Sequence, residues 1–206
     1  NLDTAKEKHK LYYSENVYRA PKTSGNFREI LQFGVEVIGR LSDEDLFNLI
    51  FLAAKSLLVF DDMPVLLVSD NSMIQKMMEK AGLSKLNDRI LNAFQNKSLM
   101  LLKEVLTDNH ADQKDQDILA SLLSLHLPLD RGIEKLEKIL DGETFRENIE
   151  YLKDLNQYLK NQDLNTQVFL DFSIPEGLKY YDRLSFVGVI PGVSSAILRG
   201  GEYSNL

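Results

Sequence analysis

Near the start of the chain, hydrophobic and polar residues are interspersed over two stretches that we expect to form β-strands. These are residues 11–19 and 28–39, with the sequences LYYSENVYR and REILQFGVEVIG. The segment between them, APKTSGNF, contains proline, serine, glycine and asparagine, which favour turns. The pattern therefore predicts two strands joined by a loop, and such a loop can close over a ligand.

The second predicted strand carries two polar residues at positions where core residues would be expected. Gln32 and Glu36 are an even number of residues apart, so both side chains project from the same face of a sheet. Arg19 ends the first strand, close to the loop. An acid, an amide and an arginine on one sheet surface indicate a site for a polar ligand.

Helical periodicity begins after the second strand. Ser42 is expected to cap a helix with an acidic first turn, and hydrophobic residues recur at helical spacing from 46 to 58. The short hydrophobic run 64–70 predicts a strand, followed by a helix that Asn71 caps and that ends at Gly82. The methionines within that helix are expected to fill the core: Met73, Met77 and Met78.

The middle of the chain, residues 84–162, has a helical and polar pattern with breaks near Asn96, Asp108, Pro128 and Asp141. It contains no recognisable catalytic constellation, and its charges are expected to face solvent. Strands are predicted again at 166–172 and 179–190, and Pro191–Gly192 favours a hairpin with the segment that follows.

Strands on both sides of a helical middle predict an α+β fold with a mostly antiparallel sheet flanked by helices. We expect three parts: residues 1–83 and 164–206 form the core, and residues 84–163 form a helical insert or layer.

Composition narrows the possible functions. The 206 residues include 31 acidic and 24 basic side chains, a net charge of −7, which argues against broad attraction to nucleic-acid phosphates. There is no cysteine, so disulfides, thiolate nucleophiles and thiolate metal sites are excluded, and the three histidines are too far apart to predict a zinc site. The sequence has no long hydrophobic run and no signal-peptide pattern, so we expect a cytoplasmic protein. We expect it to need no metal and no cofactor.

Three segments together resemble the histidyl branch of the class II aminoacyl-tRNA synthetases. YYSENVYR followed by ILQFGVEVIG is similar to the second signature motif of that class. GLKYYDRLSFVGVI is similar to the histidine-site motif, and RGGEYSNL to a Gly-Gly-Arg-Tyr-Asp-x-Leu motif. The order and approximate spacing agree, so the resemblance implies a class II synthetase-like fold. The long first helix, the dimerisation motif and the final glycine-rich strand of full-length relatives are not evident.

The chain departs from these motifs at positions where the synthetases carry charged residues. Arg19 is kept, but Pro21 stands where motif 2 usually has an acid. Glu176 stands at the position of the catalytic arginine, and Lys179 replaces an aspartate. A synthetase needs a cation at position 176 to stabilise the anionic groups during adenylation. The residues that resemble the amino-acid pocket are retained: Gln32, Glu36, Tyr180 and Tyr181.

This profile is similar to the regulatory subunit of short-form ATP phosphoribosyltransferase, a non-catalytic paralogue of histidyl-tRNA synthetase. The resemblance implies a partner, the catalytic subunit at the first step of histidine biosynthesis, with L-histidine as feedback effector. It implies a homo-oligomer within a hetero-oligomer, and no binding to tRNA or membranes. Glu36 would take the α-ammonium group of histidine, Gln32 would give an oriented polar contact, and a tyrosine would face the imidazole.

Each assignment has a plainer alternative. Gln32 and Glu36 could pair only with neighbouring strands, and Arg19 could be a structural ion-pair partner. Consecutive tyrosines face opposite sides of a strand, so at most one of Tyr180 and Tyr181 is expected to reach a pocket. For the whole protein, an active synthetase core and a structural interaction domain with a vestigial pocket remain the competing interpretations.

Overall fold

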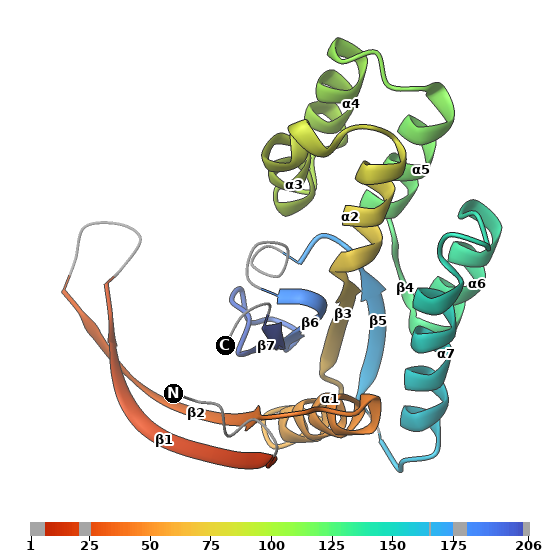
Figure 1. The fold of residues 1–206 in the computed structure, drawn as a ribbon. Coiled ribbons are helices and arrows are strands. Elements are labelled where there is room, and N and C mark those ends of the chain that lie inside the picture. The colour runs from red at the N-terminus through yellow and green to blue at the C-terminus, as the bar shows by residue number, and fades with distance from the viewer. Residues whose placement is uncertain (1–6, 21–25, 165, 175–180, 204–206) are drawn as a thin grey trace. The chain divides into compact units, whose positions relative to one another are not determined.

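The computed structural model of the chain describes residues 7–20, 26–164, 166–174 and 181–203. The chain divides into two compact units, Asn1–Leu46 and Phe47–Leu206. Figure 1 shows the elements of each unit.

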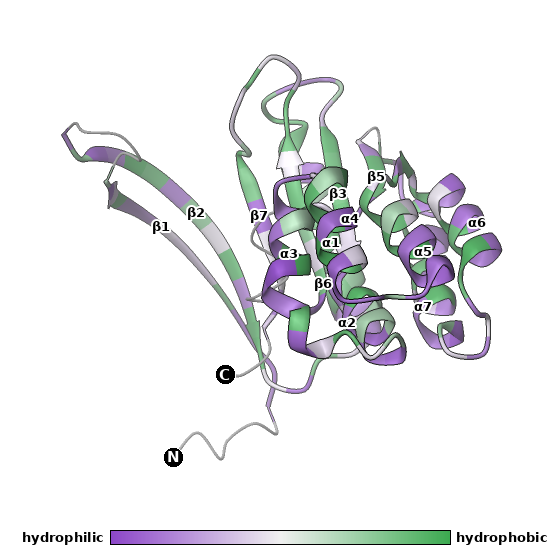
Figure 2. Cartoon of the chain, turned by 90° about the horizontal axis from the view of Figure 1, so that it is seen from above, coloured by the Kyte–Doolittle hydropathy of each residue, from purple (hydrophilic) through white to green (hydrophobic). Residues whose placement is uncertain are grey.

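The first unit is built on a long antiparallel hairpin. Strand β1 (His9–Arg19) pairs with β2 (Arg28–Ile38) along their whole length, from His9↔Ile38 to Arg19↔Arg28. In Figure 2, β1 is mostly hydrophilic, whereas hydrophilic and hydrophobic residues are interspersed along β2. Successive side chains of each strand point to opposite faces. The two predicted strands are confirmed to within two residues at each end.

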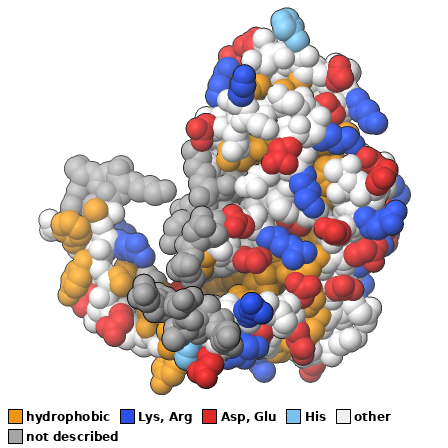
Figure 3. All heavy atoms as spheres, in the orientation of Figure 1, with side chains coloured by type: hydrophobic (Ala, Val, Ile, Leu, Met, Phe, Trp, Pro, Cys, Tyr) orange, Lys and Arg blue, Asp and Glu red, His pale blue; other side chains and the backbone are white. Residues whose placement is uncertain are grey.

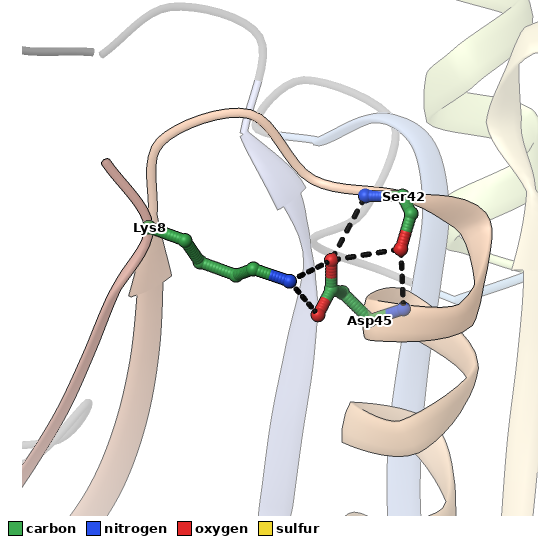
Figure 4. A network of polar contacts seen from close by, with 3 residues as sticks. All are labelled: Lys8, Ser42 and Asp45. Carbon is green, nitrogen blue, oxygen red and sulfur yellow. Dashed lines mark hydrogen bonds and ion pairs between the residues drawn. The ribbon is translucent and has the colours of Figure 1, made fainter. Parts of the chain in front are cut away.

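A capping box opens helix α1 (Asp43–Leu57) (Figure 4). The backbone N–H of Asp45 donates to Ser42 Oγ at 3.3 Å, and the backbone N–H of Ser42 donates to Asp45 Oδ2 at 2.9 Å. Lys8 Nζ donates to both carboxylate oxygens of Asp45, at 2.6 and 2.7 Å. These bonds satisfy donors at the start of the helix and tie it to the residue preceding β1. The prediction that Ser42 caps this helix is therefore confirmed.

A five-stranded sheet forms the centre of the second unit, in the order β4-β5-β3-β6-β7. The β3–β5 pair is parallel and the other three pairs are antiparallel. The strands are β3 (Val65–Asp70), β4 (His126–Pro128), β5 (Gln167–Asp171), β6 (Tyr181–Val189) and β7 (Leu198–Tyr203). The predicted mostly antiparallel sheet and the predicted final hairpin are thus confirmed.

Helices pack on this sheet through close contacts with small residues. A Cβ at Gly188 of β6 would lie 2.7 Å from Leu57 of α1, and one at Gly132 of α6 would lie 2.8 Å from Leu170 of β5. The remaining helices are α2 (Asn71–Lys80), η1 (Ser84–Leu86), α3 (Asn87–Gln95), α4 (Leu99–Asp108), α5 (Gln113–Leu123), α6 (Leu129–Ile139) and α7 (Arg146–Lys160). In Figure 2, α6 and α7 carry both hydrophobic and hydrophilic colours, as amphipathic helices do.

The helical middle and its breaks near Asn96, Asp108, Pro128 and Asp141 are confirmed, since helices end or begin at each of them. One of these breaks contains strand β4, which the sequence does not predict because three residues ending in proline carry no strand pattern. The three methionines of α2 are buried, as expected.

One helix cap was predicted wrongly. Asp70, not Asn71, caps α2: its side chain accepts from the backbone N–H of Ser72 at 3.1 Å. Both residue types are good caps. Asn71 is the first residue of the helix, and its side chain is bonded elsewhere.

Candidate functional site

The hairpin of the first unit holds a chain of three polar side chains on one face. Arg19 donates through Nη2 to Gln32 Oε1 at 2.9 Å, and Gln32 donates through Nε2 to the Tyr13 hydroxyl at 2.8 Å. Each end of the Gln32 amide is thus occupied, and its orientation is fixed by the two neighbours. The structure thus brings together two predicted site residues, Arg19 and Gln32. The Gln32 side chain bonds to residues of the neighbouring strand, which is the pairing that the alternative interpretation expects.

Tyr13 was not predicted as a site residue. It lies directly opposite Gly34 in the hairpin register, and a Cβ at Gly34 would overlap its ring. Glycine at this position therefore lets the tyrosine ring lie across β2, where its hydroxyl reaches Gln32. In the sequence, Gly34 lies between the polar residues Gln32 and Glu36. Its pairing with the aromatic residue Tyr13 can be recognised only when the register of the two strands is known.

Glu36 lies on the same face of β2 as Gln32, four residues further along. It is half-buried and stands opposite Leu11. Four residues of extended strand separate the two backbone positions by roughly 13 Å, so a small ligand between them would meet an amide at one end and a carboxylate at the other. Glu36 supplies the negative charge that an ammonium group requires.

The opposite face of the hairpin is hydrophobic and exposed. Antiparallel partners share a face, and those of this face include Tyr12↔Val35 and Ser14↔Phe33. Its large exposed side chains are Tyr12, Tyr18, Leu31, Phe33 and Val35. Hydrophobic side chains are visible on the hairpin in Figure 3. The face of Gln32 and Glu36 also exposes hydrophobic residues, namely Leu11, Ile30 and Ile38. Because it holds the polar chain as well, it is the better candidate for a small polar ligand.

The predicted tyrosines belong to the second unit. Tyr180 and Glu176 lie outside the described residues. Tyr181 begins β6, and its ring packs against the Tyr203 ring, with 5.5 Å between centroids. A Cβ at Gly201 would overlap the Tyr181 ring, and one at Gly200 would overlap Phe186. Both glycines thus allow an aromatic ring to lie close to the backbone of β7.

A second polar cluster surrounds Asp171, at the end of β5. Its Oδ2 accepts from Lys97 Nζ at 3.0 Å and lies 2.8 Å from His126 Nδ1. Its Oδ1 accepts from the backbone N–H of Ser173 at 2.8 Å. Burial alone would raise the pKa of the Asp171 carboxyl, but these donors outweigh it and hold that pKa below its ordinary value. The His126 ring also stacks on Phe169, as a packing residue would.

Within the described ranges, no group of three or more histidine, aspartate and glutamate side chains could hold a metal ion. Among the same residues, no helix combines the length and hydrophobicity needed to cross a membrane.

A family model described as Histidyl-tRNA synthetase matches residues 1–206, the whole of the sequence. The chain belongs to the histidyl-tRNA synthetase family. The predicted α+β, synthetase-like fold is thereby confirmed, and solved structures agree with it. An ATP phosphoribosyltransferase regulatory subunit/histidyl-tRNA synthetase from Bacillus halodurans superposes with a TM-score of 0.82 at 21% identity, over 98% of this chain and 53% of that one. An ATP phosphoribosyl transferase (HisG:HisZ) complex from Thermotoga maritima gives 0.77 at 18% identity, over 97% and 70%.

Two different names occur among the curated relatives of this chain. An ATP phosphoribosyltransferase regulatory subunit from Geobacter sulfurreducens is 28% identical over 96% of this chain and 46% of its own length. One from Thermoanaerobacter sp. is 26% identical, over 96% and 52%. A histidine–tRNA ligase from Sulfolobus acidocaldarius is 27% identical, over 96% and 46%. The chain thus spans about half the length of these relatives, and identity alone does not separate the two groups.

Proposed function

We propose that the protein containing this chain is a non-catalytic regulatory subunit of ATP phosphoribosyltransferase. It binds L-histidine, is needed for activity of the catalytic subunit, and transmits histidine feedback at the first step of histidine biosynthesis. It works as a homo-oligomer within a complex with the short catalytic subunit. Relatives named as this regulatory subunit support the proposal over 96% of the chain.

The polar face of the hairpin carries the histidine-binding part of this proposal. Gln32 is held by Arg19 and Tyr13 at 2.9 and 2.8 Å, so its amide is oriented before a ligand arrives. Preorganised polar groups lower the cost of ordering on binding. Glu36 gives the face a carboxylate for the α-ammonium group of histidine. From the resemblance to the histidine-site motif alone, Tyr181 of the second unit is the residue that we propose for recognition of the imidazole.

The non-catalytic part rests on the altered histidine-site motif. Adenylation places negative charge on a phosphorus centre, and an enzyme stabilises it with cations. Glu176 would bring a negative charge to the position where the family motif has its arginine. Feedback then follows from linkage: histidine binds one state of the complex more tightly and shifts the population toward that state.

A second candidate is an active histidyl-tRNA synthetase core. It is favoured by the relative named histidine–tRNA ligase, at 27% identity. The two candidates share a histidine site but differ in ATP chemistry, since only a synthetase forms an adenylate from histidine and ATP.

The histidine site is tested by calorimetric titration of L-histidine into full-length protein and two variants. Glu36→Gln removes the charge on the polar face and keeps the size of the side chain. Loss of a charged hydrogen bond costs about 1.5–3 kcal/mol, so we expect affinity to fall by roughly 10- to 150-fold.

The matched control is Glu29→Gln, which makes the same change on the same strand. Glu29 is an odd number of residues from Glu36 and lies opposite Tyr18, so it projects from the hydrophobic face. We expect this variant to bind histidine like the wild type. Equal affinity in all three proteins would remove Glu36 from the site, and equal losses in both variants would indicate a general effect of charge.

A further inference from the structure

Three consecutive polar residues at the junction of β3 and α2 are completely buried: Ser69, Asp70 and Asn71. Burial of polar groups is costly unless they are hydrogen-bonded. Asp70 accepts from Asn148 at 2.7 Å and from Ser72, so it is occupied by α7 and by the first turn of α2. The Asn71 side chain takes no part in these bonds and points to β6 instead.

Strand β6 loses its regular partners at the end where Tyr181 lies. Its ladder with β3 ends at the pair Asp70↔Leu184. On its other side, Tyr181 pairs with Tyr203 and Ser185 with Gly201, so four steps along β6 match two steps along β7. This is a bulge on β6, and bulges commonly turn a side chain toward a functional site.

The Asn71 side chain bonds to the strand at both ends of this bulge. Its Nδ2 donates to the backbone carbonyl of Tyr181 at 3.2 Å, and its Oδ1 accepts from the Ser185 hydroxyl at 3.3 Å. Ser69 donates to the same oxygen at 3.1 Å. The β3 backbone stops pairing with β6 at Asp70, just before helix α2 begins. The Asn71 side chain thus supplies contact with β6 beyond that point.

From this geometry we infer that Asn71 is a positioning residue for Tyr181, fixing the bulged start of β6 so that Tyr181 takes the orientation needed at the histidine site. The inference rests on the proposed function where it concerns histidine. The hold of Asn71 on the strand can be tested without any ligand.

The test uses full-length protein in which the tyrosines are replaced by 3-fluorotyrosine, observed by ¹⁹F NMR. Tyr181→Phe assigns the Tyr181 resonance, and the other tyrosines serve as internal references. Gly201→Ala checks the sensitivity of the probe, since a Cβ there would overlap the Tyr181 ring.

The decisive comparison is Asn71→Ala with Asn148→Ala. Both truncate a buried asparagine, but only Asn71 is bonded to β6, whereas Asn148 is bonded to Asp70. We expect Asn71→Ala to shift or broaden the Tyr181 resonance. Of the hydrogen bonds lost in this variant, one holds the Tyr181 carbonyl, and its loss should weaken histidine binding by roughly 2- to 12-fold. Asn148→Ala should lower the unfolding midpoint while leaving the Tyr181 resonance in place. If Asn71→Ala does not fold, Asn71→Ser, which keeps a polar group but cannot reach the Tyr181 carbonyl, replaces it.

An unchanged Tyr181 resonance in the Asn71 variant would overturn the inference, as would an equal change in the Asn148 variant. A moved resonance with unaltered histidine affinity would overturn its functional half. If wild-type protein binds no histidine, the proposed function fails, and the NMR comparison still decides whether Asn71 positions Tyr181.

Discussion

The Tyr13 hydroxyl accepts a 2.8 Å hydrogen bond from Gln32 Nε2, across the two strands of the hairpin. Because Arg19 occupies the other end of the same amide, Gln32 has a defined orientation in which its carbonyl oxygen faces Arg19. The candidate histidine site therefore begins with a side chain that is held from both sides.

Removing the Tyr13 hydroxyl should loosen this arrangement. In Tyr13→Phe the Gln32 amide loses its acceptor, and one neutral hydrogen bond is worth about 0.5–1.5 kcal/mol. We expect histidine affinity, measured by calorimetry, to fall by roughly 2- to 12-fold. Tyr12→Phe is the matched control, because Tyr12 is 87% exposed on the opposite face; a similar loss in that variant would contradict the role given to Tyr13.

Gly34→Ala should displace the Tyr13 ring, because a Cβ at position 34 would overlap it. We expect weaker histidine binding than in Tyr13→Phe, since the whole ring moves and the Gln32 amide is released with it. Gly142→Ala is the control: no atom lies within 4 Å of a Cβ there. Titration of both variants checks the prediction, and undiminished binding by Gly34→Ala would show that Tyr13 is dispensable.

The Asp171 cluster should make stability depend on pH in a definite direction. The pKa of Asp171 is lowered in the folded state, because its hydrogen-bond donors outweigh burial. Its contribution to the free energy of unfolding is then complete above the unfolded pKa of about 3.9 and is lost as pH falls through the folded pKa.

We therefore expect Asp171→Asn to cost about 1.5–3 kcal/mol at pH 7, the value of a hydrogen bond to a charged group. The difference from wild type should shrink as urea unfolding is repeated at pH values below 3.9. Glu104→Gln, which neutralises an exposed acid on α4, should change little at any pH. A difference that grows on acidification would refute the assigned direction.

The capping box of α1 gives a prediction about stability alone. Ser42→Ala removes the acceptor of the Asp45 N–H and should lower the free energy of unfolding by about 1 kcal/mol. Ser42→Asn, which keeps a good capping residue, should lose only a few tenths of that. Urea unfolding measures both, and equal losses would show that the cap contributes nothing at this position.

The shared face of Gln32 and Glu36 can be predicted from the strand period alone, whereas their ligand-binding role comes from the resemblance to the synthetase motif. Even spacing places Gln32 and Glu36 on one face whatever the rest of the fold, because the period of a strand is two. Tyr13 could not be predicted in this way. Its role depends on the register Tyr13↔Gly34, and a register is set by turn geometry and packing as well as by pattern.

Asn71 and β4 show a second limit of the sequence. Asp70 and Asn71 are both good helix caps, and the choice is decided by a carbonyl that lies 110 residues further along the chain, at Tyr181. Strand β4 exists because His126–Pro128 pairs with β5. In both cases a partner distant in sequence, and not a local preference, determines the structure.

The most direct test of the account is calorimetric titration of L-histidine into full-length wild-type protein, with and without the ATP phosphoribosyltransferase catalytic subunit, accompanied by an assay of histidine-dependent ATP–pyrophosphate exchange. The account predicts saturable histidine binding without exchange. Exchange activity would contradict it and return the protein to the active synthetases, and the absence of binding in every condition would leave only a structural role.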